Sequence, residues 1–332
     1  MRIAIVGLGG VGVHHLRIMS AMDEFEVVAA CDTNEDLLQE RTKGRSIACY
    51  ADAAALLATE RLDAVSLCTP PKAHPPHTRW AAERGVHVLC EKPMAPTPEL
   101  CQQMIDDCTR HHVVLMVAHK KRFVAAVQRL KHLCDTDLGP IQVLYHRYPH
   151  PWMSEADWFW AEDDGGGPLV ENAVHAADCL HFLMGDVERV YAEGDVFNAP
   201  HRAPQLNCAV YTARFQSGAM AMVGAGMIGT PAPGLMFEDF YAACVNGTAQ
   251  VAGGFDNPTE LKYAFRNKPT ELHVEEFEGE DPFVAEFRHF SDCVATGRTP
   301  ISSGPESKKA ITLCHAVKAS ARTRTPVEIE PV

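Results

Sequence analysis

The fold of the amino-terminal part of the chain is decided by one stretch, Arg2-Ile3-Ala4-Ile5-Val6-Gly7-Leu8-Gly9-Gly10-Val11-Gly12. Its first five residues form an apolar run that is typical of a buried strand, and the remainder is a complete G-x-G-x-x-G. In such a turn Gly7 allows the tight bend, Gly9 lets the backbone approach a pyrophosphate, and Gly12 lets the next helix pack close to the strand. The stretch therefore predicts a strand, turn and helix whose N-terminus faces an anion.

A second apolar run, residues 26–31, ends on Asp32, which lies 20 residues after Gly12. This is the spacing at which an acidic side chain binds the ribose hydroxyls of a dinucleotide. Glycine-rich turns also occur for backbone reasons alone, so the competing interpretation is a surface turn followed by an exposed aspartate.

Up to about residue 119, strand-like and helix-like segments alternate, which predicts a doubly wound parallel sheet with helices on both faces. Further strands are expected at 64–68, 86–90 and 113–118, and helices at 35–42, 51–58, 77–84 and 97–111. Ligands of such sheets bind at the carboxyl ends of the strands. The segments of interest are therefore 7–12, 69–71 and 91–93.

The composition of the chain limits its class. With 332 residues it is long enough for two domains, and its net charge of −13 argues against nucleic-acid or anionic-membrane partners. Its 12 cysteines form no C-x-x-C and are interpreted as reduced thiols of a cytoplasmic protein. No secretory signal and no apolar run of ~20 residues is apparent.

After about residue 121 the pattern changes. A helix at 123–133 is followed by alternating stretches that predict a mostly antiparallel sheet, at 141–148, 187–197, 208–215 and 219–224. One face of that sheet is expected to contact a partner subunit, although core packing also explains Met220, Met222 and Met227. We expect one domain at 1–120 and another at 121–332, with the helix at about 305–321 packing back on the first.

Lys92 directly follows the strand at 86–90 and precedes Pro93. The proline restricts Lys92 to extended geometry and permits a cis peptide, which would aim the side chain at the rim where a nucleotide lies. The competing interpretation is a solvated lysine in a turn.

Residues 165–178, GGGPLVENAVHAAD, predict a turn followed by a helix that begins at Pro168. On this helix Glu171, His175 and Asp178 lie at i, i+4 and i+7 and share one face. Such a stripe is either a satisfied polar network or an active site, and a histidine exchanges protons near neutral pH. Glu171 and His175 could also hold zinc, but no second ligand pair is apparent, so no metal is expected.

Other histidines, including His14, His15, His146 and His150, are interpreted as structural or solvent-facing. The aromatic cluster before the glycines is either a wall for stacking a sugar or a domain-interface core. It comprises Trp152, Trp158, Phe159 and Trp160.

These motifs together resemble the glucose-fructose oxidoreductase/inositol dehydrogenase family, Gfo/Idh/MocA. The resemblance covers 7–12, Asp32, Thr69-Pro70 with His74, 87–93, Arg122-Phe123, 165–178 and 297–300. It implies a Rossmann domain, a second α/β domain with an open sheet used for homo-oligomerisation (a dimer or tetramer), and NAD(P)-dependent redox chemistry on sugars or cyclitols.

The resemblance also implies site residues. Lys92 would hydrogen-bond the reacting hydroxyl and the nicotinamide ribose, and His175 would accept the proton, with Glu171 beside it. The expected cofactor-binding residues are Gly7, Gly9, Gly10, Val11, Gly12, Asp32, Thr69, Pro70, His74, Glu91 and Lys92. The expected substrate-binding residues are Arg122, Trp158, Asn172 and His175. The family usually has Asp where this chain has Glu171, which weakens any transfer of substrate identity.

Asp32 favours NAD, because a carboxylate repels a 2′-phosphate, while Arg41 and Arg45 keep NADP as an alternative. The leading hypothesis is a dehydrogenase that oxidises a secondary hydroxyl of a sugar, sugar acid or cyclitol. Two alternatives stay open: an enzyme that recycles its NAD within each turnover, during elimination, epimerisation or glycoside cleavage, and a non-catalytic dinucleotide sensor.

Overall fold

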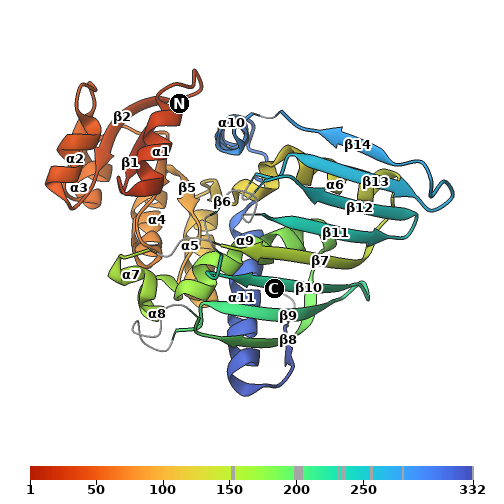
Figure 1. Cartoon of the computed structure of the whole chain (residues 1–332). Helices are drawn as coiled ribbons and strands as arrows, with labels where there is room; N and C mark the ends of the chain where they lie inside the picture. The colour runs from red at the N-terminus through yellow and green to blue at the C-terminus, as the bar shows by residue number, and fades with distance from the viewer. Residues whose placement is uncertain are drawn as a thin grey trace. The chain divides into compact units, whose positions relative to one another are not determined.

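The computed structural model describes residues 1–150, 154–197, 205–229, 232, 237–254, 257–278 and 280–330 (Figure 1). The chain forms two compact units, which are described separately. The first comprises Met1–Ala118 and Phe283–Lys308, and the second comprises His119–Pro282 and Lys309–Val332. The chain therefore leaves the first unit after Ala118 and contributes one later segment to it.

The first unit is built on a six-stranded sheet in the order β3-β2-β1-β4-β5-β6, and every adjacent pair is parallel. Its strands are β1 (Arg2–Val6), β2 (Glu26–Cys31), β3 (Ala48–Tyr50), β4 (Ala64–Leu67), β5 (His87–Glu91) and β6 (Leu115–Ala118). Its helices are α1 (Gly10–Met19), α2 (Glu35–Thr42), α3 (Ala53–Thr59), η1 (Pro71–Ala73), α4 (His74–Ala82), α5 (Pro98–Arg110) and α10 (Pro282–Thr296). This order is the doubly wound Rossmann arrangement, which confirms the predicted fold class for this part of the chain.

Local sequence explains why these elements begin where they do. Side chains of Asn34, Asp52 and Thr97 accept hydrogen bonds from backbone amides in the first turns of α2, α3 and α5. Such caps satisfy amides that a helix cannot pair internally. The residues of β4 are all buried, as expected of a central strand covered on both faces.

The later segment of the first unit packs against its sheet. Phe287 and Phe290 of α10 are fully buried, and the Val117 amide donates to the Ser302 carbonyl at 2.9 Å. The antiparallel bridge between Met116 and Ser303 extends the sheet beyond β6. Completion of this unit thus requires residues nearly 200 positions away, a link that short sequence motifs do not reveal.

The second unit is built on a nine-stranded sheet in the order β14-β13-β12-β11-β7-β10-β9-β8-β15. Its strands are β7 (Ile141–Pro149), β8 (Val187–Asp195), β9 (Cys208–Phe215), β10 (Met220–Gly226), β11 (Asp239–Cys244), β12 (Gly247–Ala252), β13 (Glu260–Phe265), β14 (His273–Glu276) and β15 (Val327–Glu328). Its helices are η2 (Lys120–Phe123), α6 (Ala125–Thr136), α7 (Asp157–Trp160), α8 (Glu162–Gly165), α9 (Pro168–Met184) and, for the most part, α11 (Gly304–Thr323). Adjacent strands are antiparallel except for β7 and β10, which are parallel, so the predicted mostly antiparallel sheet is confirmed.

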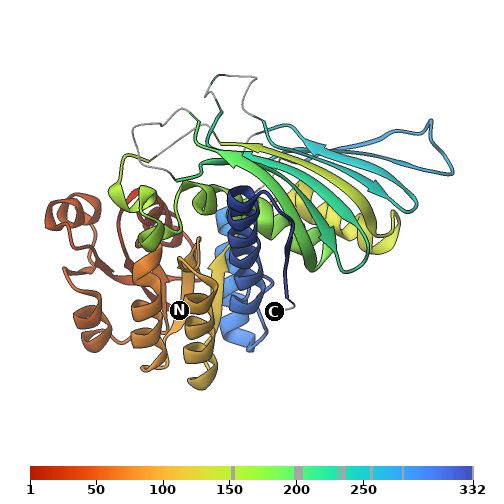
Figure 2. The ribbon, with the colours of Figure 1, turned by 90° about the horizontal axis from the view of Figure 1, so that it is seen from below.

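The two faces of this sheet differ. Helix α9 packs against β7, β9 and β10, while α6 packs against β12 and β13. Figure 2 shows these helices on one face, and within the described residues the other face carries no helix. Across that uncovered face, the strand register aligns exposed side chains of five neighbouring strands in one row: Tyr241, Tyr145, Met222, Thr212 and Tyr191.

No helix in the described parts of the chain is both long and apolar enough to cross a membrane.

Candidate active site

The glycine turn between β1 and α1 has the geometry that its sequence predicts. Gly7 has a φ of +91°, and a Cβ there would lie 2.7 Å from the Cys68 carbonyl group at the end of β4. A Cβ on Gly12 would lie 1.9 Å from the Gly7 carbonyl oxygen. Both positions therefore exclude any side chain, because a contact this short cannot be relieved by small shifts.

Gly9 and Gly10 are glycines for a different reason. A Cβ at either position would meet no atom within 4 Å among the described residues, and both residues are exposed. Gly9 caps α1 without a side-chain hydrogen bond, and Val11 follows in the first turn. Open space beside uncapped helical amides is where a phosphate group fits.

Asp32 at the end of β2 is tied to this turn. Its Oδ2 accepts from the Leu8 amide at 2.7 Å, and its Oδ1 accepts from the Asn34 amide at 2.9 Å. These contacts fix the carboxylate beside the glycine turn. Each oxygen retains acceptor capacity, which a ribose hydroxyl can use.

His74 joins the turns that follow β4 and β5. Its Nε2 lies 2.8 Å from the Thr69 carbonyl oxygen, next to Pro70, and its Nδ1 lies 3.1 Å from the Met94 carbonyl oxygen. Burial lowers the pKa of His74, so the ring is neutral near pH 7 and donates to only one of these carbonyls. The His74 side chain is fully buried and engaged with the backbone.

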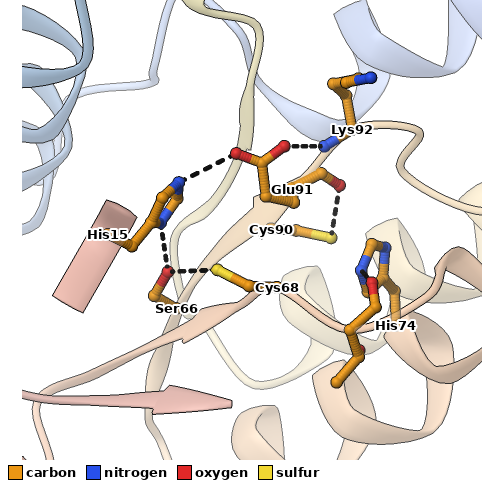
Figure 3. A network of polar contacts seen from close by, with 8 residues as sticks. His15, Ser66, Cys68, His74, Cys90, Glu91 and Lys92 are labelled. Carbon is orange, nitrogen blue, oxygen red and sulfur yellow. Dashed lines mark hydrogen bonds and ion pairs between the residues drawn. The ribbon is translucent and has the colours of Figure 1, made fainter. Parts of the chain in front are cut away.

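Lys92 follows the last residue of β5, and the Lys92–Pro93 peptide bond is cis. The preceding Glu91 is buried, and its Oε2 accepts from the Lys92 amide at 3.0 Å. Glu91 Oε1 lies 2.9 Å from His15 Nε2, and His15 Nδ1 lies 2.8 Å from Ser66 Oγ (Figure 3). A polar network thus joins His15 of α1 to Ser66 of β4 and, through Glu91 of β5, to the backbone amide of Lys92.

The network holds opposite charges in the interior. Burial would lower the pKa of His15, but interactions with Cys68 and Glu91 outweigh burial and raise it to about 10. Burial would likewise raise the pKa of the Glu91 carboxyl, but His15 and the charge of Lys92 lower it. The ring is therefore an imidazolium that donates from both nitrogens, paired with a carboxylate. His15 is one of the histidines expected to be structural or solvent-facing. Its spacing of three residues from Gly12 places it on the helix face that meets the sheet, which distinguishes it from His14.

In the second unit, α9 presents the predicted polar stripe. Gly166 and Gly167 have φ values of +81° and +84°, and Pro168 then opens the helix. His175 is 7% exposed and Asp178 is fully buried, whereas Glu171 in the first turn is partly exposed. The three residues lie on one face but have different surroundings.

Asp178 contacts two basic side chains from the first residues of the second unit, Arg122 and His119. Its two carboxylate oxygens each accept from Arg122 Nε at 3.0 Å, and His119 Nε2 lies 3.8 Å from Oδ1. The Arg122 guanidinium also lies over the Phe182 ring. Arg122 is thus buried in an ion pair, so the described structure gives it a role in holding α9 to η2.

Asn172 lies one helical turn before His175. It is fully buried, and neither Oδ1 nor Nδ2 has a hydrogen-bond partner among the described residues. A buried amide without partners costs about 1–3 kcal/mol, so native proteins rarely keep one without a further reason. A ligand that both donates and accepts hydrogen bonds would supply it.

Next to His175 lies a buried cluster of aromatic and charged side chains that the sequence did not predict. The His175 ring packs edge-on against Tyr148 with centroids 5.8 Å apart, and Lys121 Nζ lies 5.1 Å from the centroid of Tyr148. Lys121 forms a buried ion pair with Glu238, which also faces His146 at 3.3 Å. Burial works against ionisation of Glu238, but Lys121 and His146 outweigh it and lower its pKa.

Of the aromatic residues before the glycines, Trp158 lies in α7. A Cβ on Gly165 would lie 3.2 Å from its indole ring, so the two residues are close neighbours. Phe159 is buried between Trp158 and Trp160. Trp152 lies outside the described residues. Within the described ranges, no group of three or more His, Cys, Asp or Glu side chains is placed to hold a metal ion.

Comparison with known proteins agrees with this architecture. Residues 1–119 match a family model described as an oxidoreductase family with an NAD-binding Rossmann fold, and residues 127–253 match the GFO/IDH/MocA C-terminal domain. The chain is 26% identical to myo-inositol 2-dehydrogenase of Thermotoga maritima, covering 100% of this chain and 99% of that protein. It is 27% identical to D-xylose 1-dehydrogenase (NADP(+)) 2 of Haloferax volcanii, covering 99% and 100%.

Among solved structures, the WlbA dehydrogenase of Bordetella pertussis in complex with NADH and UDP-GlcNAcA is 25% identical, with a TM-score of 0.83. The match covers 100% of this chain and 99% of that one.

Proposed function

Because the chain belongs to the GFO/IDH/MocA family, it is an NAD(P)-dependent oxidoreductase that acts on sugar-type hydroxyl groups, and we propose that Lys92 and His175 carry its proton chemistry. The substrate is a sugar, sugar acid or cyclitol with an oxidisable secondary hydroxyl.

The observation that carries this proposal is the pair formed by Asn172 and His175. The Asn172 amide is buried with no partner among the described residues, and it shares a helix face with a histidine that is 7% exposed. A polyhydroxylated substrate offers adjacent donors and acceptors, so one hydroxyl can satisfy the amide while the next faces the imidazole.

The first unit fits a dinucleotide. The open space at Gly9 and Gly10 beside the uncapped start of α1 suits a pyrophosphate, and Asp32 suits a ribose diol. When bound there, the nicotinamide supplies the hydride acceptor. Asp32 favours NAD over NADP, because its carboxylate repels a 2′-phosphate.

Each proposed catalytic residue has one task. His175 removes the proton of the reacting hydroxyl as general base, and Glu171 stabilises the resulting imidazolium. The Lys92 ammonium donates a hydrogen bond to the same oxygen and stabilises the negative charge that develops on it. Thr69, Pro70 and His74 shape the neighbouring turn, and His74 acts through the backbone because it is fully buried. Arg122 and Trp158 hold the walls of the substrate region.

The test is a panel of sugars, cyclitols and sugar acids that includes D-xylose and myo-inositol, with NAD or NADP and absorbance of the reduced nicotinamide as the signal. On the best substrate, Lys92→Ala and His175→Ala should each lower kcat by roughly 10²- to 10⁴-fold. Dinucleotide affinity should remain within a few-fold. His181→Gln is the matched control, because His181 lies on the same helix but hydrogen-bonds the Gly185 carbonyl at 3.1 Å.

Near-normal rates for both alanine variants would contradict the assigned roles. Product formation without net reduced cofactor would instead indicate an enzyme that recycles its NAD. Tight dinucleotide binding without turnover of any polyol would indicate a sensor.

We also propose that the protein forms a homo-oligomer through the uncovered face of the nine-stranded sheet. Tyr145, Met222 and Tyr241 are 44%, 46% and 45% exposed and adjoin one another across three strands. Exposed apolar rows of this kind are typical of subunit interfaces.

A cytoplasmic location is supported by the twelve cysteines, which are all free.

A further inference from the structure

His15 occupies an unusual position for a charged side chain. It lies on α1 three residues after Gly12, and its side chain is fully buried. The Phe283 and Phe287 rings of α10 contact it edge-on, with centroids at 5.7 and 4.6 Å. The imidazolium is thus enclosed by apolar rings on one side and faces the sheet on the other.

On the sheet side, both ring nitrogens are used. Nδ1 lies 2.8 Å from Ser66 Oγ on β4, and Nε2 lies 2.9 Å from Glu91 Oε1 on β5. The Ser66 hydroxyl in turn lies 3.5 Å from Cys68 Sγ. One side chain therefore connects the glycine-turn helix with the two strands whose carboxyl ends flank it.

The connection ends on the main chain of Lys92. Glu91 Oε2 accepts from the Lys92 amide at 3.0 Å, and in Figure 3 the Lys92 side chain points away from that carboxylate. Glu91 therefore fixes the backbone of Lys92 while leaving the direction of its side chain to other groups. Glu91 therefore contacts the His15 ring with one carboxylate oxygen and the Lys92 amide with the other.

Stability alone does not account for such a group. Replacing a buried ion pair by apolar side chains of similar volume is often neutral or stabilising, whereas removing one partner is strongly destabilising. A fully hydrogen-bonded buried network instead holds its members in one arrangement. Here the last side chain of the network is Glu91, the residue directly before Lys92.

We propose that His15 is a positioning residue for Lys92, acting through Glu91, with Ser66 orienting the ring. This inference rests on the proposed function, in which Lys92 contacts the reacting oxygen. Misplacement of a catalytic group by about 1 Å can cost roughly 10²-fold in rate. The expected result of breaking the network is therefore a fall in kcat of about 10- to 100-fold.

The first measurement needs neither substrate nor cofactor. Hydrogen exchange of the Lys92 amide is followed at residue resolution by NMR. In His15→Leu this amide should exchange at least about tenfold faster than in the native protein, while amides in the middle of β2 are unchanged. His15→Gln, which keeps a donor toward Glu91, should restore most of the protection. His14→Gln is the matched control and should show native exchange.

The second measurement is a double-mutant cycle on the best polyol from the panel. His15→Leu and Ser66→Ala are made alone and with Lys92→Ala, and kcat, the KM for NAD and the thermal midpoint are compared. Alone, His15→Leu should lower kcat with little change in the KM for NAD, and Ser66→Ala should do so to a smaller extent. In the Lys92→Ala background neither should lower kcat further, because the group that they position is gone.

Native exchange of the Lys92 amide in His15→Leu would overturn the inference, as would an equal fall in kcat with and without Lys92. If His15→Leu does not fold, Ser66→Ala decides instead: exchange of the Lys92 amide and kcat should both change in the direction expected of His15→Leu, to a smaller extent, and native values of both would overturn the inference. The proposed function fails separately, when Lys92→Ala alone keeps near-normal turnover.

Discussion

At Asn172 the chain keeps a fully buried amide whose donor and acceptor have no partner among the described residues. The cost of leaving such a group unpaired is about 1–3 kcal/mol. A ligand that supplies both partners recovers that free energy on binding, which links stability and function at one residue.

Replacing Asn172 by Leu, which has a similar shape, should therefore separate these two properties. The free energy of unfolding should stay level or rise by about 1 kcal/mol, because an unpaired polar group is removed. The KM for the polyol should rise by about tenfold or more, because its hydroxyls lose their partner. Urea unfolding and steady-state kinetics measure the two quantities. A large loss of stability with an unchanged KM would show that the amide is a structural group.

We propose that Asp32 sets the preference between the two dinucleotides. Replacement by Asn keeps an acceptor for the Leu8 amide, now 2.7 Å from the carboxylate, but removes the negative charge. The ratio of kcat/KM for NAD to that for NADP should fall by about tenfold or more, since repulsion of the 2′-phosphate is lost. An unchanged ratio would assign cofactor choice to other residues.

Sequence alone could predict residues whose role follows from a local rule. The positions of Gly7, Gly12 and Pro168 follow from turn and helix geometry, and the structure has each in the expected conformation. The three-residue spacing from Gly12 favours burial of His15 over His14, but its partners Ser66 and Glu91 lie 51 and 76 residues away, so local rules do not predict them.

At the scale of elements, the glycine turn combines two kinds of glycine. Gly12→Ala should destabilise the protein by more than ~3 kcal/mol, because its Cβ would lie 1.9 Å from the Gly7 carbonyl oxygen. Gly10→Ala meets open space, and its stability should stay within about 1 kcal/mol of the native protein. Its affinity for NAD should nevertheless fall about tenfold or more, because the methyl group occupies the space for the pyrophosphate. Calorimetry of unfolding and of NAD binding distinguishes the two variants.

Helix α8 is held to α11 by an ion pair that depends on pH. Lys318 Nζ donates to Glu162 Oε1 at 2.5 Å and to the Gly166 carbonyl at 2.8 Å, and Arg322 also contacts Glu162. Partial burial would raise the pKa of Glu162, but these two cations outweigh it and lower the pKa to about 2. The lowered pKa means that the stabilisation is complete above pH 4.5 and is lost as the pH falls toward about 2.

Glu162→Gln should therefore be less stable than the native protein by about 1–2 kcal/mol near neutral pH, a value reduced because 35% of the Glu162 side chain is exposed. The difference should shrink as the pH falls below 4.5, and urea unfolding across that range measures it. A difference that stays constant with pH would mean that packing rather than charge holds α8.

Strands buried on both faces could be predicted from the sequence, whereas strands of mixed composition could not. The strands of the first unit are apolar runs bounded by Gly, Pro or polar residues, so the sequence predicts most of them. Strands β11 to β14 were not predicted, because much of their sequence mixes small, polar and charged residues, as in Lys262 and Glu275. Their pairing within the nine-stranded sheet, rather than local preference, makes them strands.

At the scale of the whole molecule, the first unit contains the residues proposed to bind the dinucleotide, and the second contains the proposed general base, His175. The segment at 283–308 belongs to the first unit although it follows nearly all of the second. It supplies Phe283 and Phe287, which enclose His15, so the first unit is completed only after residues 119–282 of the second have been made. No local pattern in the first 120 residues indicates that requirement.

The uncovered sheet face predicts the state of assembly. Tyr145→Lys places a charge at the centre of the aligned row, next to Met222 and Tyr241. The mass in solution measured by light scattering should fall to that of a smaller species, because burying an unpaired charge in an interface is costly. Leu272→Lys, at a residue that is 64% exposed and outside the row, should leave the mass unchanged. If Tyr145→Lys keeps the mass of the native assembly, as Leu272→Lys should, this face is not the interface.

The central claim, oxidation of a secondary hydroxyl by hydride transfer to NAD, is tested most directly with a polyol that carries deuterium on the reacting carbon. After incubation with the protein and NAD, mass spectrometry of the cofactor should find one deuterium in an accumulating reduced dinucleotide, and Lys92→Ala should suppress it. Retention of the deuterium in the polyol, or its return to a product while the cofactor stays oxidised, would contradict the account.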